Sequence, residues 1–129
     1  MKYIPLIGRT LFSLIFLMTI MGHFSSGSAA YAASAGVPMA SVLVPLSGII
    51  ATLGAISIIL GYKAKFGAWL IVLFLIPVTL MMHKFWTATD PMAIQMQMST
   101  FMKNLSMLGG ALMITYFGAG PASIDNMKK

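Results

Sequence analysis

Four stretches of the chain are predominantly apolar, and short segments rich in polar residues, glycine or proline separate them. The stretches cover residues 4–24, 39–62, 66–86 and 99–118. One helical crossing of a hydrocarbon core takes about 20 apolar residues, so the pattern predicts four crossings. The predicted fold class is therefore all-α, with residues 1–129 forming a single transmembrane domain, a four-helix bundle.

The links carry two further helical signals. Tyr31 lies among alanines in an uncharged segment of small residues, which predicts a short interfacial helix near residues 28–35. Asp90 and Pro91 form an N-cap and first-turn pair before the fourth stretch. A helix that begins at Pro91 and a bend into the crossing near Ser99 fit this pattern equally well.

The first apolar stretch fits two interpretations. Lys2 and Arg9 precede an apolar run, and the small-residue pattern Ala33-Ser34-Ala35 follows it, as in a cleaved signal peptide. The same residues fit a first crossing that is retained. Composition leaves both interpretations open.

The second stretch is predicted to pack closely against another helix. Ser47, Ala51 and Ala55 recur every four residues, and Gly54 widens this small-residue surface. Small side chains at helical spacing let membrane helices approach through their backbones. The stretch is therefore expected to lie in the bundle core.

Composition narrows the function classes. The chain is 59% hydrophobic and 8% charged, far from a soluble domain, and it lacks the cysteines that disulfides and iron–sulfur clusters need. Its net charge of +6 is typical of basic cytoplasmic loops, so the expected partner is the lipid bilayer and no nucleic acid is expected.

The basic residues predict an orientation. Four crossings leave Lys84 and Lys103 on one side and place the other basic residues opposite, namely Lys2, Arg9, Lys63, Lys65, Lys128 and Lys129. Because Lys and Arg accumulate on the cytoplasmic side, both termini are expected in the cytoplasm of a bacterial-type inner membrane.

Polar residues on the outer side form the candidate ligand-binding site. It consists of His83, Lys103 and Asn104, with supporting positions at Lys84, Asp90 and His23. An ionisable group at membrane depth is costly, so Lys103 either snorkels to the headgroups or faces inward to hold an anion or a quinone carbonyl. The chain has no self-sufficient catalytic constellation, which leaves open whether it is an enzyme.

Two metal-containing cofactors are disfavoured. His23 and His83 could ligate a haem, although hydrogen-bonded histidines at helix ends are commoner. Thioethers could hold copper(I), but methionine is also ordinary apolar filling. The methionines near the candidate site are Met81, Met82, Met92, Met96, Met98, Met102 and Met107.

The chain resembles the DoxX family of small four-helix membrane proteins. The resemblance rests on Gly8-Arg9, Val44-Pro45-Leu46-Ser47-Gly48, Leu60-Gly61-Tyr62-Lys63-Ala64-Lys65, His83-Lys84-Phe85-Trp86, and the run Phe101-Met102-Lys103-Asn104-Leu105-Ser106-Met107-Leu108-Gly109-Gly110. It implies an uncleaved first helix and a non-catalytic or accessory subunit of a quinone-linked membrane oxidoreductase system. A redox-protein partner or a homo-oligomer would then be expected. The alternatives are a small-molecule or ion binding or transport protein, and a purely structural membrane subunit.

Overall fold

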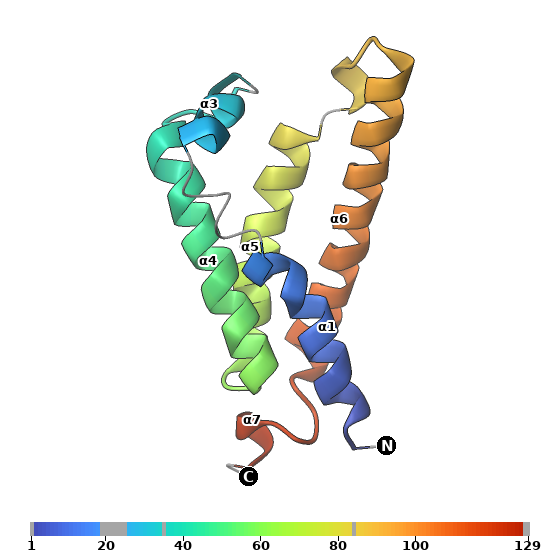
Figure 1. The fold of residues 1–129 in the computed structure, drawn as a ribbon. Coiled ribbons are helices and arrows are strands. Elements are labelled where there is room, and N and C mark those ends of the chain that lie inside the picture. Colours follow the sequence, from blue (N-terminus) through green and yellow to red (C-terminus); the bar gives the residue numbers. More distant parts are fainter. Residues whose placement is uncertain (1, 19–25, 35, 84, 128–129) are drawn as a thin grey trace.

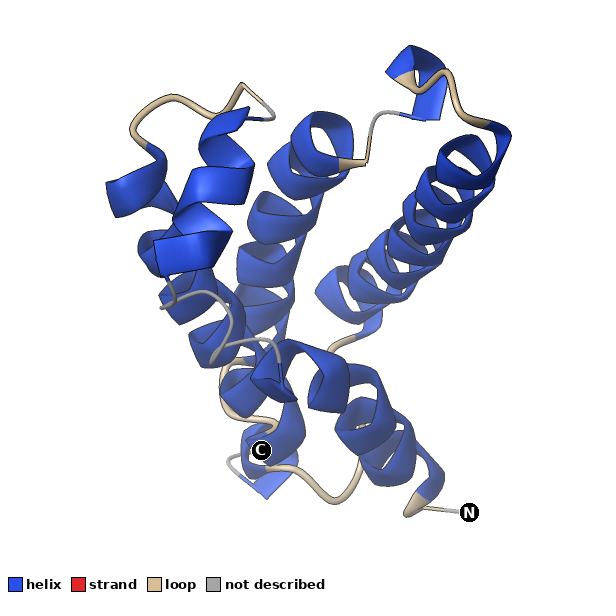
Figure 2. Ribbon diagram, turned by 45° about the horizontal axis from the view of Figure 1, so that its top comes forward, coloured by secondary structure: helices blue, strands red, loops and turns tan. Residues whose placement is uncertain are grey.

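The computed structural model describes residues 2–18, 26–34, 36–83 and 85–127, and these residues form helices with no β-strand among them (Figure 2). The all-α prediction is confirmed. The long helices are α1 (Ile4–Met18), α4 (Ala40–Leu60), α5 (Ala64–Met82) and α6 (Pro91–Phe117). The short helices are α3 (Ser26–Ser34), the 3-10 turn η1 (Phe85–Thr87) and α7 (Ile124–Met127).

Helix α5 lies at the centre of the arrangement, between α4 and α6 (Figure 1). Helix α1 packs against α4 at the end where both termini lie, and α3 packs against α4 at the opposite end (Figure 1). The first end, which holds the α4–α5 turn and α7, is called the basic end below. The opposite end is called the cavity end.

Within the described chain, two segments are long and apolar enough to cross a membrane, namely α4 and Ala64–Thr87. Helix α1 has 15 residues and is shorter than a crossing. The predicted first crossing, residues 4–24, continues past Met18 into residues that lie outside the described part.

Two predicted boundaries differ from the observed helices. Helix α5 begins at Ala64, before the predicted residue 66, because the carboxylate of Asp125 accepts the backbone N–H groups of Lys63 and Ala64. It ends at Met82, before the predicted residue 86, because His83 has left helical backbone geometry at φ −124° and ψ 56°.

Helix α6 begins at Pro91, the earlier of the two starts that the sequence left open. Asp90 precedes it in extended conformation, and Pro91 occupies the first turn, where the missing amide hydrogen costs nothing. Residues 91–117 therefore form one continuous helix without a break near Ser99.

The expected small-residue surface of α4 is confirmed. Ala51 and Ala55 are fully buried. A β-carbon added to Gly54 would lie 2.8 Å from the carbonyl oxygen of Gly67 on α5. The two helix backbones therefore meet at these glycines, and large apolar side chains such as Ile58, Ile71 and Leu75 fill the core around the contact.

Candidate functional site

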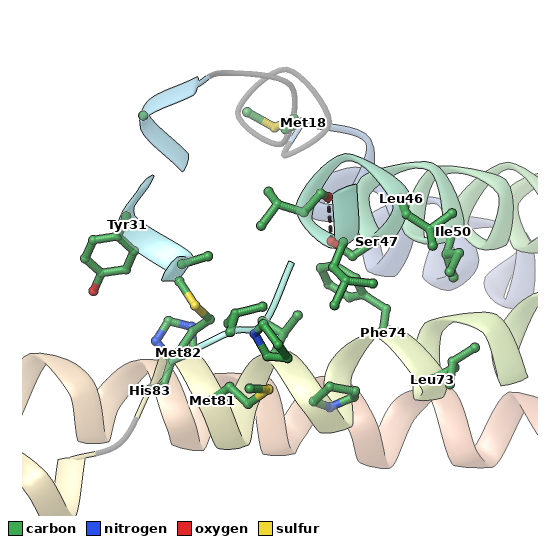
Figure 3. A pocket seen from close by; sticks show the side chains of 18 residues that line it. Met18, Tyr31, Leu46, Ser47, Ile50, Leu73, Phe74, Met81, Met82 and His83 are labelled. Carbon is green, nitrogen blue, oxygen red and sulfur yellow. Dashed lines mark hydrogen bonds between the residues drawn. The ribbon is translucent and has the colours of Figure 1, made fainter. Parts of the chain in front are cut away.

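A cavity of about 990 Å³ lies between α3, α4 and α5 at the cavity end (Figure 3). Its α4 wall comes from positions 43–50 and its α5 wall from positions 73–83, on one side of the Gly54–Gly67 contact. Helix α3 supplies Tyr31 and Ala32. The cavity therefore forms where α4 and α5 no longer touch through glycine and α3 stands beside them.

The cavity walls are mostly apolar. Figure 3 shows His83, Met82 and Tyr31 toward one end, and Ile50 and Leu73 toward the other. The hydroxyl of Ser47 donates to the carbonyl of Val44 at 2.7 Å, so this polar wall residue is internally paired. An apolar molecule would meet few unsatisfied polar groups inside.

Two polar groups remain for a ligand at the wall. Nδ1 of His83 lies 3.0 Å from Oε1 of Gln97, and an amide oxygen can only accept, so Nδ1 carries the hydrogen. In the neutral ring Nε2 is then an acceptor. The carbonyl of the wall residue Leu73 also lacks its usual helical donor, because residue 77 is proline.

The three residues of the predicted cluster have different surroundings in the structure. Asn104 is only 6% exposed, and it lies seven residues after Gln97, on the same face of α6. Lys103 is exposed on the neighbouring face. Across the described part of the chain, no hydrogen bond links His83, Lys103 and Asn104 to one another.

Of the three supporting positions, the structure describes Asp90. Asp90 is exposed at the start of α6, and its side chain makes no capping hydrogen bond. His23 and Lys84 fall outside the described residues, so the haem hypothesis and their part in the cluster stay predictions. Met81 and Met82 line the cavity, whereas the other methionines discussed for copper are exposed or half-buried on α6.

The basic end holds a buried polar cluster that sequence reasoning missed. Arg9 is 4% exposed, and its guanidinium donates to the carbonyls of Ile58, Ile59 and Ala122 at 3.0, 2.9 and 2.7 Å. The first two carbonyls end α4, where a cation also meets the negative end of the helix dipole. Arg9 therefore joins three parts of the chain, namely α1, the end of α4 and the C-terminal segment.

Asp125 completes this Arg9 cluster from the C-terminal segment. Its carboxylate accepts N–H groups of Lys63 and Ala64 at 2.7 and 2.9 Å, and its own N–H donates to the carbonyl of Gly61 at 2.7 Å. Gly61 has φ +68°, and an added β-carbon would lie 2.7 Å from Nη1 of Arg9. Only glycine fits this turn.

The sequence contained signals for some of the functional residues that were not predicted. Gln97, Asn104 and Ala111 recur every seven residues, which places them on one face of α6. Arg9, a charged residue inside an apolar stretch, was a second such signal. Its partner Asp125 was not predictable, because 116 residues separate the two in sequence.

Residues 1–129 match the profile of the SURF4 family over the whole chain. The chain belongs to the SURF4 family. It is 30% identical to the inner membrane protein YphA of Escherichia coli over 124 residues, which cover 93% of this chain and 86% of YphA. No solved structure matches it.

A second SURF4-family relative is the ER-derived vesicles protein ERV29 of Saccharomyces cerevisiae. The two are 32% identical over 77 residues, which cover 60% of this chain and 24% of ERV29. The alignment thus spans about a quarter of that relative's length. Together the two relatives show that this chain is a membrane protein.

The family match corrects two expectations. The DoxX resemblance is wrong, because the family profile and YphA place the chain in the SURF4 family. The role as an accessory subunit of a quinone-linked oxidoreductase is wrong with it. The segments behind the resemblance are short and rich in glycine and apolar residues, which membrane helices of many families share.

Proposed function

We propose that this chain is a membrane protein that binds a single-chain amphiphile, such as a fatty acid, in the cavity between α3, α4 and α5. The cavity itself is the observation that carries the proposal. Its volume of about 990 Å³ lies at the upper end of the range for small-molecule sites. Its length from Ile50 and Leu73 to His83 suits an apolar chain that ends in a polar head (Figure 3).

The wall chemistry favours an amphiphile over a free ion. An ion would lose its hydration among apolar side chains and would find few compensating partners, which costs several kcal/mol. The head of an amphiphile needs only one or two hydrogen bonds. Nε2 of His83 is an acceptor at one end of the cavity, so the head must donate an O–H, as the protonated form of a fatty acid does.

The polar head carries most of the selectivity. Lipid tails are themselves apolar, so a chain that leaves the bilayer for the cavity gains little hydrophobic free energy. Hydrogen bonding at His83 then determines which amphiphile the cavity binds. Its ring is already oriented by Gln97, which lowers the cost of ordering it.

We further propose that α1, α4, α5 and α6 all cross the membrane as one four-helix bundle. Helix α6 has 27 residues, about 40 Å of helix, and the apolar sequence of α1 continues past Met18 to Met21. The basic end would face the cytoplasm of an inner membrane, since Lys63 and Lys65 lie there. Single cysteines at the exposed positions Lys65 and Thr89 test this in a chain without native cysteine; labelling of Lys65→Cys from outside contradicts the orientation.

Photo-crosslinking with a diazirine-bearing palmitic acid tests the binding proposal. Ser47→Trp fills the cavity wall and should reduce the labelling yield about tenfold. Leu53→Trp, on an exposed position of the same helix, is the matched control and should label like the parent. Equal labelling of both variants would show that the probe binds only the lipid-facing surface.

His83→Phe sharpens the same test, because it keeps an aromatic ring and removes both nitrogens. One neutral hydrogen bond is worth about 0.5–1.5 kcal/mol, so binding should weaken about threefold to tenfold. Palmitic acid methyl ester, which lacks an acidic head, should then compete less well than palmitic acid in the parent and equally well in the variant. An unchanged preference would remove His83 from the site.

A further inference from the structure

A second, smaller pocket opens at the basic end, far from the cavity. Its volume is about 320 Å³, and it lies between the α4–α5 turn, the end of α6 and α7. Lys63 and Lys65 line one side, and Phe117 to Gly120 line the other. It shares no lining residue with the α3–α4–α5 cavity.

Aromatic side chains place this pocket at the level of lipid headgroups. Tyr and Trp concentrate at membrane interfaces, where the ring is apolar and its edge is polar. Exposed aromatic residues surround the basic end on four segments of the chain. They are Tyr3, Tyr62, Phe66, Trp69, Tyr116 and Phe117.

The two lysines are positioned around the pocket. The Cε atom of Lys65 would lie 3.3 Å from a β-carbon added to Gly118, so its stem runs beside that glycine. The ammonium of Lys63 lies 5.6 Å from the ring centre of Tyr62. Both ammonium groups are exposed rather than paired with a carboxylate within the described chain.

Backbone donors add to the lysines. Gly118 donates its N–H to Ile114, but the N–H groups of Ala119 and Gly120 donate to no other described residue. Ala119 is only 4% exposed. Unpaired backbone amides beside ammonium groups are the donors that bind phosphate oxygens.

The acidic residue at the pocket does not cancel this charge. Both carboxylate oxygens of Asp125 accept backbone N–H groups at the start of α5, and the buried guanidinium of Arg9 lies nearby. Both carboxylate oxygens are thus directed at the start of α5, and Lys63, Lys65 and Arg9 together outnumber this one acidic residue.

We infer that this pocket binds a phosphate group, as carried by an anionic phospholipid headgroup or by a soluble phosphate. Basic pockets between helices at the membrane surface are suited to lipid phosphates. A bound headgroup would bridge the end of α6 and the α4–α5 turn, which Asp125 of α7 also contacts.

Native mass spectrometry of the whole chain in a neutral detergent tests this inference. Phosphatidylglycerol should bind more tightly than phosphatidylcholine, and Lys65→Gln should weaken phosphatidylglycerol binding about fivefold. The double variant Lys63→Gln/Lys65→Gln should lose about twenty-five-fold. Lys2→Gln is the matched control, because Lys2 is an exposed lysine at the same end that does not line the pocket.

Inorganic phosphate as a competitor separates the two sources of the ligand. If inorganic phosphate displaces phosphatidylglycerol from the parent but not from Lys65→Gln, the pocket also binds a soluble phosphate. If it displaces no lipid from the parent, the pocket binds the lipid headgroup alone. Equal binding of the two lipids by the parent, or equal losses in Lys65→Gln and Lys2→Gln, would overturn the inference. Neither result bears on the cavity, whose lining these variants leave unchanged.

Discussion

The two ends of the molecule differ in how tightly the same helices, α4 and α5, pack against each other. At the basic end, Arg9 and Asp125 pair with helix termini, and α4 and α5 meet through Gly54 and Gly67. At the cavity end the same two helices line an apolar space together with α3, and among the described residues one hydrogen bond, His83 with Gln97, reaches the cavity wall from another long helix. The basic end therefore holds the fold, and the cavity end is free to hold a ligand.

The largest effect should come from breaking the basic end. Arg9→Met leaves the carbonyls of Ile58, Ile59 and Ala122 without their donor, and we expect unfolding to become easier by about 3 kcal/mol. The stability of Arg9→Lys should lie between that of the parent and that of Arg9→Met, because an ammonium cannot donate in all the directions that a guanidinium does. SDS-induced unfolding in mixed micelles measures the change.

Lys2→Met on the same segment is the control for Arg9. Lys2 is exposed, so its loss should change the free energy of unfolding by less than about 0.5 kcal/mol. If Arg9→Met is as stable as Lys2→Met, the Arg9 cluster does not hold the fold.

A smaller effect should come from the Gly54–Gly67 contact between α4 and α5 at the basic end. Gly54→Ala forces a methyl group to within 2.8 Å of the Gly67 carbonyl oxygen and about 3.0 Å of the Ile71 side chain. The expected destabilisation is about 1–3 kcal/mol.

Gly109→Ala gives the matched comparison for Gly54. No atom lies within 4 Å of a β-carbon added there, and alanine favours a helix over glycine by about 1 kcal/mol. The two Gly→Ala variants should thus shift the unfolding midpoint in opposite directions. Shifts of the same sign and size would show that α4 and α5 do not meet at Gly54.

The smallest effects should appear at the cavity end. His83→Ala and Gln97→Ala remove two partners of one hydrogen bond, so their effects on stability should deviate from additivity by about 0.5 kcal/mol or more. His83→Ala and Lys103→Met should add, because Lys103 is exposed on another face of α6. A coupling between His83 and Lys103 as large as that with Gln97 would restore the cluster predicted from sequence.

The sequence pattern predicted where the helices lie better than it predicted which distant residues contact each other. The apolar stretch between Pro38 and Gly61 located α4 to within two residues, and its small residues indicated a close helix contact. The start of α5 was missed because its cap, Asp125, comes from the far end of the chain. Local patterns carry helix periodicity and turn chemistry, but they carry no information on long-range pairs.

The candidate site shows the same limit. His83 was identified because the four-crossing pattern places it among the polar residues of the outer side, and it does line the cavity. Lys103 and Asn104 are adjacent in sequence yet face differently, since neighbours on a helix point about 100° apart. The cavity depends on how α3 stands beside α4 and α5, which no single segment encodes.

The position of the crosslink is the most direct test of the central claim. The parent chain, in lipid nanodiscs with diazirine-bearing palmitic acid, would be irradiated and digested, and the modified residues located by mass spectrometry. We predict labels on cavity residues of α4 and α5, such as Ser47, Ile50, Phe74 and Val78, at sites that unlabelled palmitic acid protects. Labels spread over the exposed residues Leu53, Leu60 and Leu112, without protection, would contradict a ligand site at the cavity end.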